Sequence, residues 1–170
     1  MTAWDTIVRE QGPAVWRTAY RLLGDRSDAD DCMQEVFVAA VGIARRTSVQ
    51  NWPALLQRLA VLRGIDGIRR RGRERLRSAG PAGLAGLPST GPGPAQAAQA
   101  GELAAALRAA LAQLPLQQAQ VVALRYMNDL DYQEISNELN LSVRHVGVIL
   151  SRAREKLREM LKEKATDHGG

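Results

Sequence analysis

The chain has 170 residues, a formal net charge of +5 and a sequence pI of about 10.0. This length allows one domain or two small ones, and the basic balance favours an anionic partner without identifying it as nucleic acid. A single cysteine, Cys32, excludes an intrachain disulfide, and we expect it to be a buried, inert thiol. No apolar run approaches the roughly 20 residues that span a bilayer, and the N-terminus lacks a signal-peptide core, which predicts a soluble intracellular protein.

The first apolar pattern predicts a helix over residues 3–23, with an interruption at Gly12-Pro13 because proline breaks the helical hydrogen-bond ladder. Gly24 follows the last apolar residues of this pattern and is expected to end the helix.

A second helix is predicted from Ser27, an expected N-cap, and it carries an acidic stripe. Asp28, Asp31 and Glu35 lie three and four residues apart, with Gln34 beside them, so their side chains share a face. On most helices such a stripe is simply solvated. On a chain of opposite net charge it also suits a basic protein partner, and nucleic acid is then expected to bind elsewhere.

A polar loop is expected from Arg45 to Gln50, and Asn51-Trp52-Pro53 predicts the start of a third helix. Two glycines, Gly64 and Gly67, are expected to weaken this helix.

The C-terminal part of this third helix contains six arginines within nine residues. A solvated helix end is one interpretation. A phosphate-binding patch is favoured, because guanidinium groups are rigid donors suited to phosphate and neutralising phosphates releases counterions. The six are Arg69, Arg70, Arg71, Arg73, Arg75 and Arg77.

From residue 78 to residue 101 the sequence changes to Ala, Gly, Pro, Ser and Gln without any charge. This composition predicts a flexible linker between two small helical domains, residues 1–77 and residues 102–164. Because such a linker sets no placement of one domain against the other, we expect a partner to set it. A disordered tail is expected at residues 165–170.

Residues 131–161 have the pattern of a helix-turn-helix, with the second helix longer and basic. Asp131 and Glu134 predict a capping box, Asn140 suits the left-handed residue that ends a helix, and Ser142 can cap the next helix. A helical hairpin that binds nothing is the alternative that this pattern leaves open. The second helix is expected to bury an apolar stripe of Val143, Val146, Leu150, Ala153 and Leu157.

Two segments of the chain resemble the same family. Residues 28–40 (DADDCMQEVFVAA) and the helix with LLQRLAVLRGIDGIRRRGRER at residues 55–75 resemble region 2 of sigma-70-type sigma factors. Residues 110–161 resemble region 4, through LP, LRY, YxEI, LxxSxxV and LxRARxxL in that order. Only the predicted linker separates them. This layout is similar to the extracytoplasmic-function (ECF) group of bacterial sigma factors.

The resemblance implies an all-α protein, cytoplasmic, that binds core RNA polymerase at the β′ clamp helices and the β flap. It implies recognition and melting of promoter DNA, regulation by an anti-sigma factor, and no catalysis of its own. It implies no cofactor and no membrane insertion. The sequence itself contains no metal-ligand cluster and no nucleophile–base set.

The resemblance also assigns residues to three surfaces. The polymerase-binding residues are Asp28, Asp31, Gln34 and Glu35. The segment around Arg45 to Trp52 is expected to match the loop that captures a flipped base of the minus-ten element, with Asn51 or Trp52 contacting that base. The minus-ten residues are Asn51, Trp52, Arg63, Arg69, Arg70, Arg71 and Arg73. The minus-thirty-five residues, on a helix in the major groove, are Ser142, Arg144, His145, Ser151 and Arg152.

The sequence departs from the family pattern at Gly147, Val148 and Ile149, where Lys, Arg or small polar residues are usual. Base reading is then weak, unusually apolar (toward thymine methyls) or altered in preference. Two alternatives to a promoter-recognising sigma factor follow. One is a sigma-like protein that docks on polymerase or a regulator without specific promoter recognition, and the other is an ordinary two-domain transcription factor.

Overall fold

The computed structural model describes residues 3–78 and 95–167, and these ranges form seven α-helices and no strand. The predicted all-α class is therefore confirmed, and no described helix is long and apolar enough to cross a membrane. The helices are α1 (Ala3–Leu23), α2 (Arg26–Ala44), α3 (Trp52–Ser78), α4 (Ala95–Gln113), α5 (Leu116–Met127), α6 (Tyr132–Leu139) and α7 (Val143–Asp167).

Helix α1 is continuous, so the predicted interruption at Gly12-Pro13 is wrong. The ring of Pro13 is exposed, whereas Val15, Ala19 and the other apolar residues of this face are buried against α2 and α3. Burial of that face offsets the cost of about 3 kcal/mol that proline imposes inside a helix.

The connection between α1 and α2 also differs from expectation. Gly24 ends α1 as predicted, with a left-handed φ of 71°. Asp25, and not Ser27, caps α2, because its Oδ1 accepts the backbone N–H of Asp28 at 3.0 Å. A carboxylate in this position also stabilises the positive end of the helix dipole.

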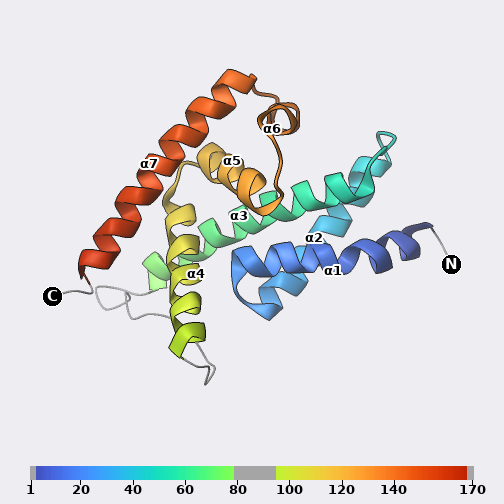
Figure 1. Cartoon of the computed structure of the whole chain (residues 1–170). Coiled ribbons are helices and arrows are strands. Elements are labelled where there is room, and N and C mark those ends of the chain that lie inside the picture. The colour runs from blue at the N-terminus through green and yellow to red at the C-terminus, as the bar shows by residue number, and fades with distance from the viewer. Residues whose placement is uncertain (1–2, 79–94, 168–170) are drawn as a thin grey trace.

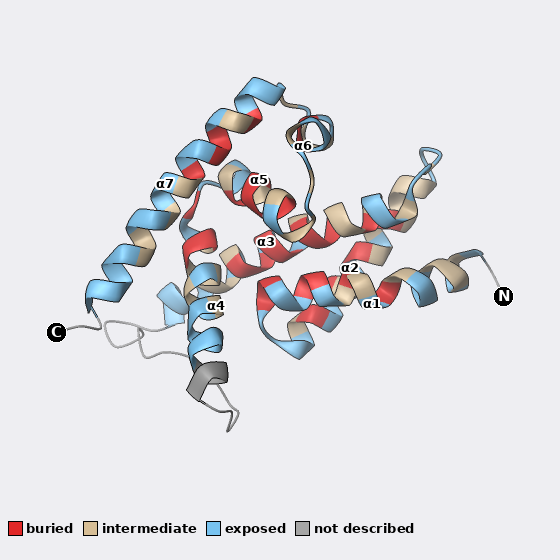
Figure 2. Cartoon of the chain, viewed as in Figure 1, coloured by how far each residue is buried: buried red, intermediate tan, exposed pale blue. Residues whose placement is uncertain are grey.

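Helix α3 runs through the middle of the molecule and packs against α1, α2, α4 and α5 (Figure 1). Its buried residues, such as Leu56, Val61 and Ile65, belong to one continuous apolar cluster that also includes Leu114 and Leu124 of the C-terminal half. Figure 2 shows this buried surface where the helices meet. The two halves therefore pack directly together, a placement that the composition of the linker does not specify.

Three arginine contacts tie the two halves together. Arg58 Nε lies 2.8 Å from Glu138 Oε2 on α6, and Arg69 Nη1 donates to the backbone oxygen of Leu114 at 2.5 Å. In the third contact the donor belongs to the C-terminal half: Arg108 Nε on α4 donates to the backbone oxygen of Arg21 on α1 at 3.0 Å. Each of these bonds joins a guanidinium of one half to an acceptor of the other.

Two helices extend beyond their predicted limits. Helix α4 begins at Ala95, inside the segment predicted as linker, because the sequence there is rich in Ala and Gln, which favour helix. Helix α7 continues to Asp167, past the predicted start of the tail at residue 165. Residues 79–94 of the predicted linker and residues 168–170 of the predicted tail lie outside the described residues.

From their low helix propensity, Gly64 and Gly67 were predicted only to weaken α3. In the structure they also let α1 pack closely against α3. Both are buried, and a Cβ on Gly67 would lie 2.7 Å from Leu23 Cδ2. A Cβ on Gly64 would collide with Leu22 Cδ1 and lie 3.0 Å from Leu22 Cβ. The glycines are therefore a packing requirement of the α1–α3 contact.

We expect Gly64→Ala to destabilise the protein by about 1 to 3 kcal/mol, because overpacking outweighs the gain in helix propensity. The measurement is urea unfolding followed by circular dichroism. Gly72→Ala on the same helix is the matched control, since its Cβ would lie 4.0 Å from Ala112 Cβ. That control should be stabilised by about 0.5 to 1 kcal/mol. Equal changes in both variants would contradict close packing at Gly64.

Candidate nucleic-acid interface

The acidic stripe predicted on α2 lies largely on the surface. Asp31, Gln34 and Glu35 are exposed. Asp28 is half-buried and forms an ion pair with Arg71 of α3. Three of the four predicted polymerase-binding side chains are therefore accessible to a partner, whereas Asp28 already has one within the protein.

A hollow of about 220 Å³ between α2 and α3 is lined by acidic and basic side chains together. Asp31 and Glu35 line it from α2, and Arg63 and Arg70 line it from α3. The sequence predicted separate surfaces for a protein partner and for nucleic acid. The structure instead places residues of both predicted sets side by side, so binding of one partner changes the field that the other meets.

Cys32 also borders this hollow and is buried, as predicted. Burial, reinforced by the negative charge of Glu35, raises the pKa of Cys32 to about 11, although Arg63 and Arg70 act in the opposite direction. At neutral pH the reactive thiolate is therefore scarce, and the thiol serves as an apolar packing group.

The predicted minus-ten arginines of α3 divide into two groups. Arg63, Arg70 and Arg73 are exposed and can reach a phosphate backbone. Arg69 and Arg71 are half-buried, and both donate to backbone oxygens of other helices or their ends. The arginine run therefore combines surface charge with internal structural contacts, which sequence density alone did not separate.

The loop between α2 and α3 is fixed at both ends. At its start, Thr47 donates its backbone N–H and its hydroxyl to the oxygen of Ile43, at 3.0 and 3.1 Å. At its end, Asn51 Oδ1 accepts the N–H of Ala54 at 3.1 Å, and Trp52 packs edge-on against Trp4 with ring centroids 4.9 Å apart. The two residues predicted to meet a flipped base thus also hold the start of α3.

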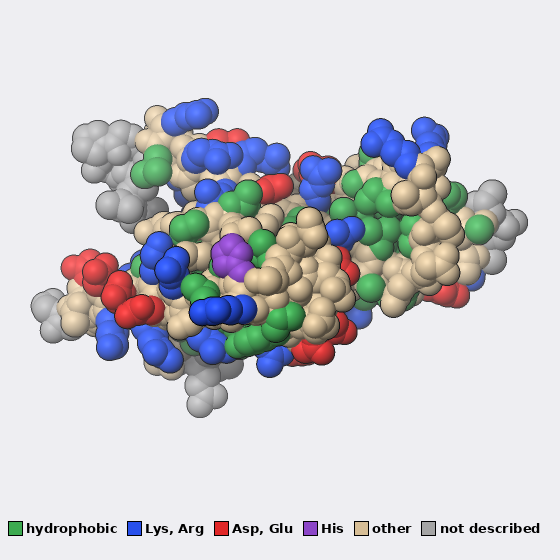
Figure 3. Space-filling view, turned by 90° about the horizontal axis from the view of Figure 1, so that it is seen from above, with side chains coloured by type: hydrophobic (Ala, Val, Ile, Leu, Met, Phe, Trp, Pro, Cys, Tyr) green, Lys and Arg blue, Asp and Glu red, His purple; other side chains and the backbone are tan. Residues whose placement is uncertain are grey.

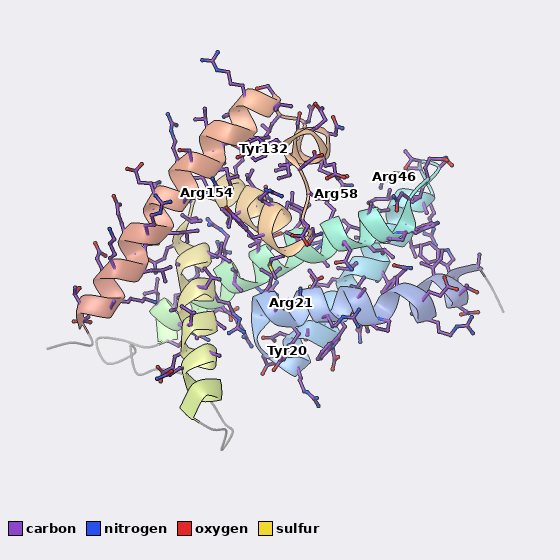
Figure 4. The ribbon with its side chains drawn as sticks, viewed as in Figure 1. Tyr20, Arg21, Arg46, Arg58, Tyr132 and Arg154 are labelled. Carbon is purple, nitrogen blue, oxygen red and sulfur yellow. The ribbon has the colours of Figure 1, made fainter. Side chains whose placement is uncertain are left out.

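The same loop exposes two arginines, Arg45 and Arg46, which lie in the segment predicted to capture a base but were not named as contacts. Figure 4 labels Arg46 beside this loop, on the side of the molecule away from α7. Two adjacent arginines before a polar segment are the sequence signal that identifies them.

The framework of the helix-turn-helix agrees with the predicted pattern. Asp131 N donates to Glu134 Oε2 at 2.7 Å and Glu134 N donates to Asp131 Oδ1 at 2.8 Å, which completes the capping box. Asn140 is left-handed with φ of 53°. Ser142 Oγ accepts the N–H of His145 at 3.1 Å, so the hydroxyl of Ser142 caps α7.

Helix α7 presents to the solvent a face of mostly polar side chains with two exposed valines, Val143 and Val148. Figure 3 looks down on this face, where the described histidine lies among Lys, Arg and hydrophobic side chains. Val143, expected in the buried stripe, is 39% exposed, whereas Val146 and Leu150 are buried. The exposed predicted residues are Ser142, Arg144, His145, Ser151 and Arg152.

Two tyrosines position α7 and were not identified from the sequence. Arg154 Nε donates to Tyr126 Oη at 2.6 Å, and its guanidinium lies 5.6 Å from the centre of that ring. Tyr132 lies beside Gly147, where a Cβ would be 3.6 Å from Tyr132 Cε2. Figure 4 labels Tyr132 where α7 faces α6 and Arg154 where α7 faces α5. Only the three-dimensional pairing of α5 and α6 with α7 reveals these contacts.

We expect Arg71→Ala to lower stability by about 1 kcal/mol, because it removes the ion pair with Asp28 and the bond to Leu23 O. Arg70→Ala, the neighbouring exposed arginine, should change stability by less than about 0.5 kcal/mol. Urea unfolding of both variants checks the difference. Equal losses of stability would contradict a structural role for Arg71 that Arg70 does not share.

Family models match both halves of the chain. The model described as Sigma-70 region 2 matches residues 7–74, and the model described as Sigma-70, region 4 matches residues 104–157. The first range holds the acidic stripe, the loop and most of the arginine run. The second holds the helix-turn-helix.

Individual relatives agree with these matches. The chain is 32% identical over 167 residues to the ECF RNA polymerase sigma factor SigE of Mycolicibacterium smegmatis, covering 98% of this chain but only 65% of that protein. It is 30% identical over 156 residues to the ECF RNA polymerase sigma factor SigW of Bacillus subtilis, covering 88% of this chain and 83% of that one.

A solved structure has a similar fold. It is the sigma factor RpoE from Bartonella quintana, crystallised with the anti-sigma factor NepR, at a TM-score of 0.55 and 21% identity. The similarity covers 95% of this chain and 98% of that one. From the two relatives and the two family models, the chain belongs to the ECF group of sigma factors in the sigma-70 family.

Proposed function

We propose that this chain directs core RNA polymerase to promoters by reading a minus-thirty-five element with α7 and by opening DNA at a minus-ten element with the loop before α3. The single observation that carries the proposal is a fully capped helix-turn-helix with an exposed basic face, on the same chain as an arginine-rich helix and a polar loop. All of its work is binding, without a covalent step.

On the minus-thirty-five side, Arg144, His145, Ser151 and Arg152 are the proposed contacts. They are exposed, and within the described part of the chain the guanidinium groups of Arg144 and Arg152 have no hydrogen-bond or ion-pair partner. Arginine binds guanine edges or phosphates in the major groove, so both are available for DNA. Ser142 supports this face by capping the helix.

On the minus-ten side, Arg63, Arg70 and Arg73 are proposed to hold the phosphate backbone, which fixes position without reading sequence. Asn51 and Trp52 are proposed to meet an unstacked base, which stacks readily on an aromatic ring. Because both also hold the start of α3, the loop reaches DNA with little further ordering, which lowers the entropic cost of binding.

Arg69 and Arg71 differ from the exposed arginines of the proposed minus-ten surface because both already have hydrogen-bond partners within the protein. Arg69 is bonded to Leu114 O of the C-terminal half, so it reaches DNA only when the two halves separate there. Arg71 is bonded to Asp28 and Leu23 O, and we propose that it acts mainly by holding α1, α2 and α3 together.

The proposed protein partner is core polymerase, with the exposed Asp31, Gln34 and Glu35 on the β′ clamp helices and the C-terminal half at the β flap. Negative side chains on a basic chain suit a positively charged protein surface and steer its encounter. An anti-sigma factor is a further proposed partner, since the similar RpoE was crystallised with one. The proposed location is the cytoplasm.

A second candidate function is docking on polymerase or a regulator without specific promoter recognition. The observation that favours it lies on α7, where Gly147 contributes no side chain and Val148 contributes no polar group to the outer face. Direct reading of a base by hydrogen bonds is therefore impossible from these two positions.

Run-off transcription separates the two candidates. With purified core polymerase and genomic promoter fragments, we expect the chain to produce discrete transcripts, because it carries both proposed promoter-reading surfaces. If the chain binds core polymerase but directs no specific start site on any fragment, promoter recognition is rejected as its function and docking is retained.

Charge reversal tests the polymerase surface. We expect Asp31→Lys with Glu35→Lys to weaken core binding at least about tenfold, since like charges then face each other across the interface. Glu10→Lys with Glu102→Lys makes the same change in net charge at exposed sites on α1 and α4 and should bind normally. Unchanged binding of the first variant, measured by fluorescence anisotropy, would exclude this stripe and favour an ordinary transcription factor.

A further inference from the structure

Val148 occupies the middle of the outer face of α7 without packing into the core. Its neighbours Val146, Ile149 and Leu150 are buried, whereas Val148 is 40% exposed. Arg144 and Arg152 lie four residues before and after it and are exposed on the same side of the helix. An apolar side chain thus stands between two free guanidinium groups.

Packing does not require the glycine next to Val148. A Cβ on Gly147 would meet only Tyr132, at 3.6 and 4.0 Å, which is ordinary contact. Gly147 is half-buried beside Tyr132 and adds no side chain of its own next to Val148. A partner surface can therefore approach Val148 more closely than it could approach a helix with long side chains at both positions.

The chemistry of Val148 restricts what it can recognise. Its side chain neither donates nor accepts a hydrogen bond, so burial against the polar edge of a base costs free energy. Among the base edges of the major groove, only thymine presents a methyl group. Arg144 and Arg152 are about 12 Å apart along the helix, one on each side of Val148, and each can bind a phosphate or a base edge next to it.

We propose that Val148 reads the 5-methyl group of a thymine in the minus-thirty-five element, with Arg144 and Arg152 fixing the register. The proposal rests on the proposed function and adds to it a specificity-determining residue. Thymine is selected by apolar contact, and Gly147 allows the helix to come close enough for that contact. Replacing thymine by uracil removes only the methyl group and leaves every hydrogen-bonding group in place.

The experiment begins with selection of minus-thirty-five sequences from a randomised promoter library by the full chain bound to core polymerase. Each thymine of the selected element is then replaced singly by deoxyuridine, and affinity is measured. For the wild-type chain we expect one position at which uracil weakens binding about fourfold, the loss for one buried methyl group.

Three variants identify the residue responsible. Val148→Ala removes the two γ-methyl groups and should lose most of the preference for thymine at that position, and Val148→Ile should keep it. Val8→Ala on α1, where the valine is 41% exposed, is the matched control and should retain the wild-type preference. Because Val148 is exposed, we expect all variants to fold, which circular dichroism checks.

Two results would overturn the proposal while leaving the proposed function intact. One is a selected element at which uracil never weakens binding by the wild-type chain. The other is a uracil effect that is as large in Val148→Ala as in the wild-type chain. If no sequence is selected and no run-off transcript appears, the proposed function itself fails, and the proposal about Val148 fails with it.

Discussion

The close contact between α1 and α3 is the constraint on which the rest of the molecule depends. Gly64 and Gly67 bring α3 against Leu22 and Leu23, where a side chain at either position would collide. Because α3 also packs against α4 and α5, its position fixes the C-terminal half relative to the N-terminal half. A small change of volume in this contact therefore affects the placement of both candidate DNA-binding surfaces, although neither glycine has a side chain that could contact DNA.

The arginines of α3 show how one helix serves structure and binding together. Arg58, Arg69 and Arg71 turn toward backbone or carboxylate oxygens of neighbouring elements. Arg63 and Arg70 face outward beside the acids of α2. Guanidinium groups tolerate both situations because they stay charged and donate in several directions at once. The division follows from the position of each arginine around the helix and not from its position in the run.

Local chemistry explains why much of the fold was predictable from the sequence. The capping box at Asp131 and Glu134 and the left-handed Asn140 depend on neighbouring residues, and these predictions are confirmed. Errors arose where distant contacts outweigh local preference. Burial keeps α1 continuous through Pro13, and Leu22 turns Gly64 from a weak helix former into a packing requirement. Pairings such as Arg154 with Tyr126 need the fold itself, because no spacing in the sequence connects them.

The packing of the two halves restricts access to the candidate surface on α3 but not to the one on α7. Arg58 and Arg69 of α3 are bonded to the C-terminal half, so their release requires that those contacts break. On α7, Arg144, Val148 and Arg152 stay exposed while the halves are packed together. A duplex can therefore reach α7 without any rearrangement, whereas full use of α3 requires separation. A ligand shifts a conformational equilibrium only by its preference for one state. Under the proposed function, strand opening and separation of the halves therefore favour each other.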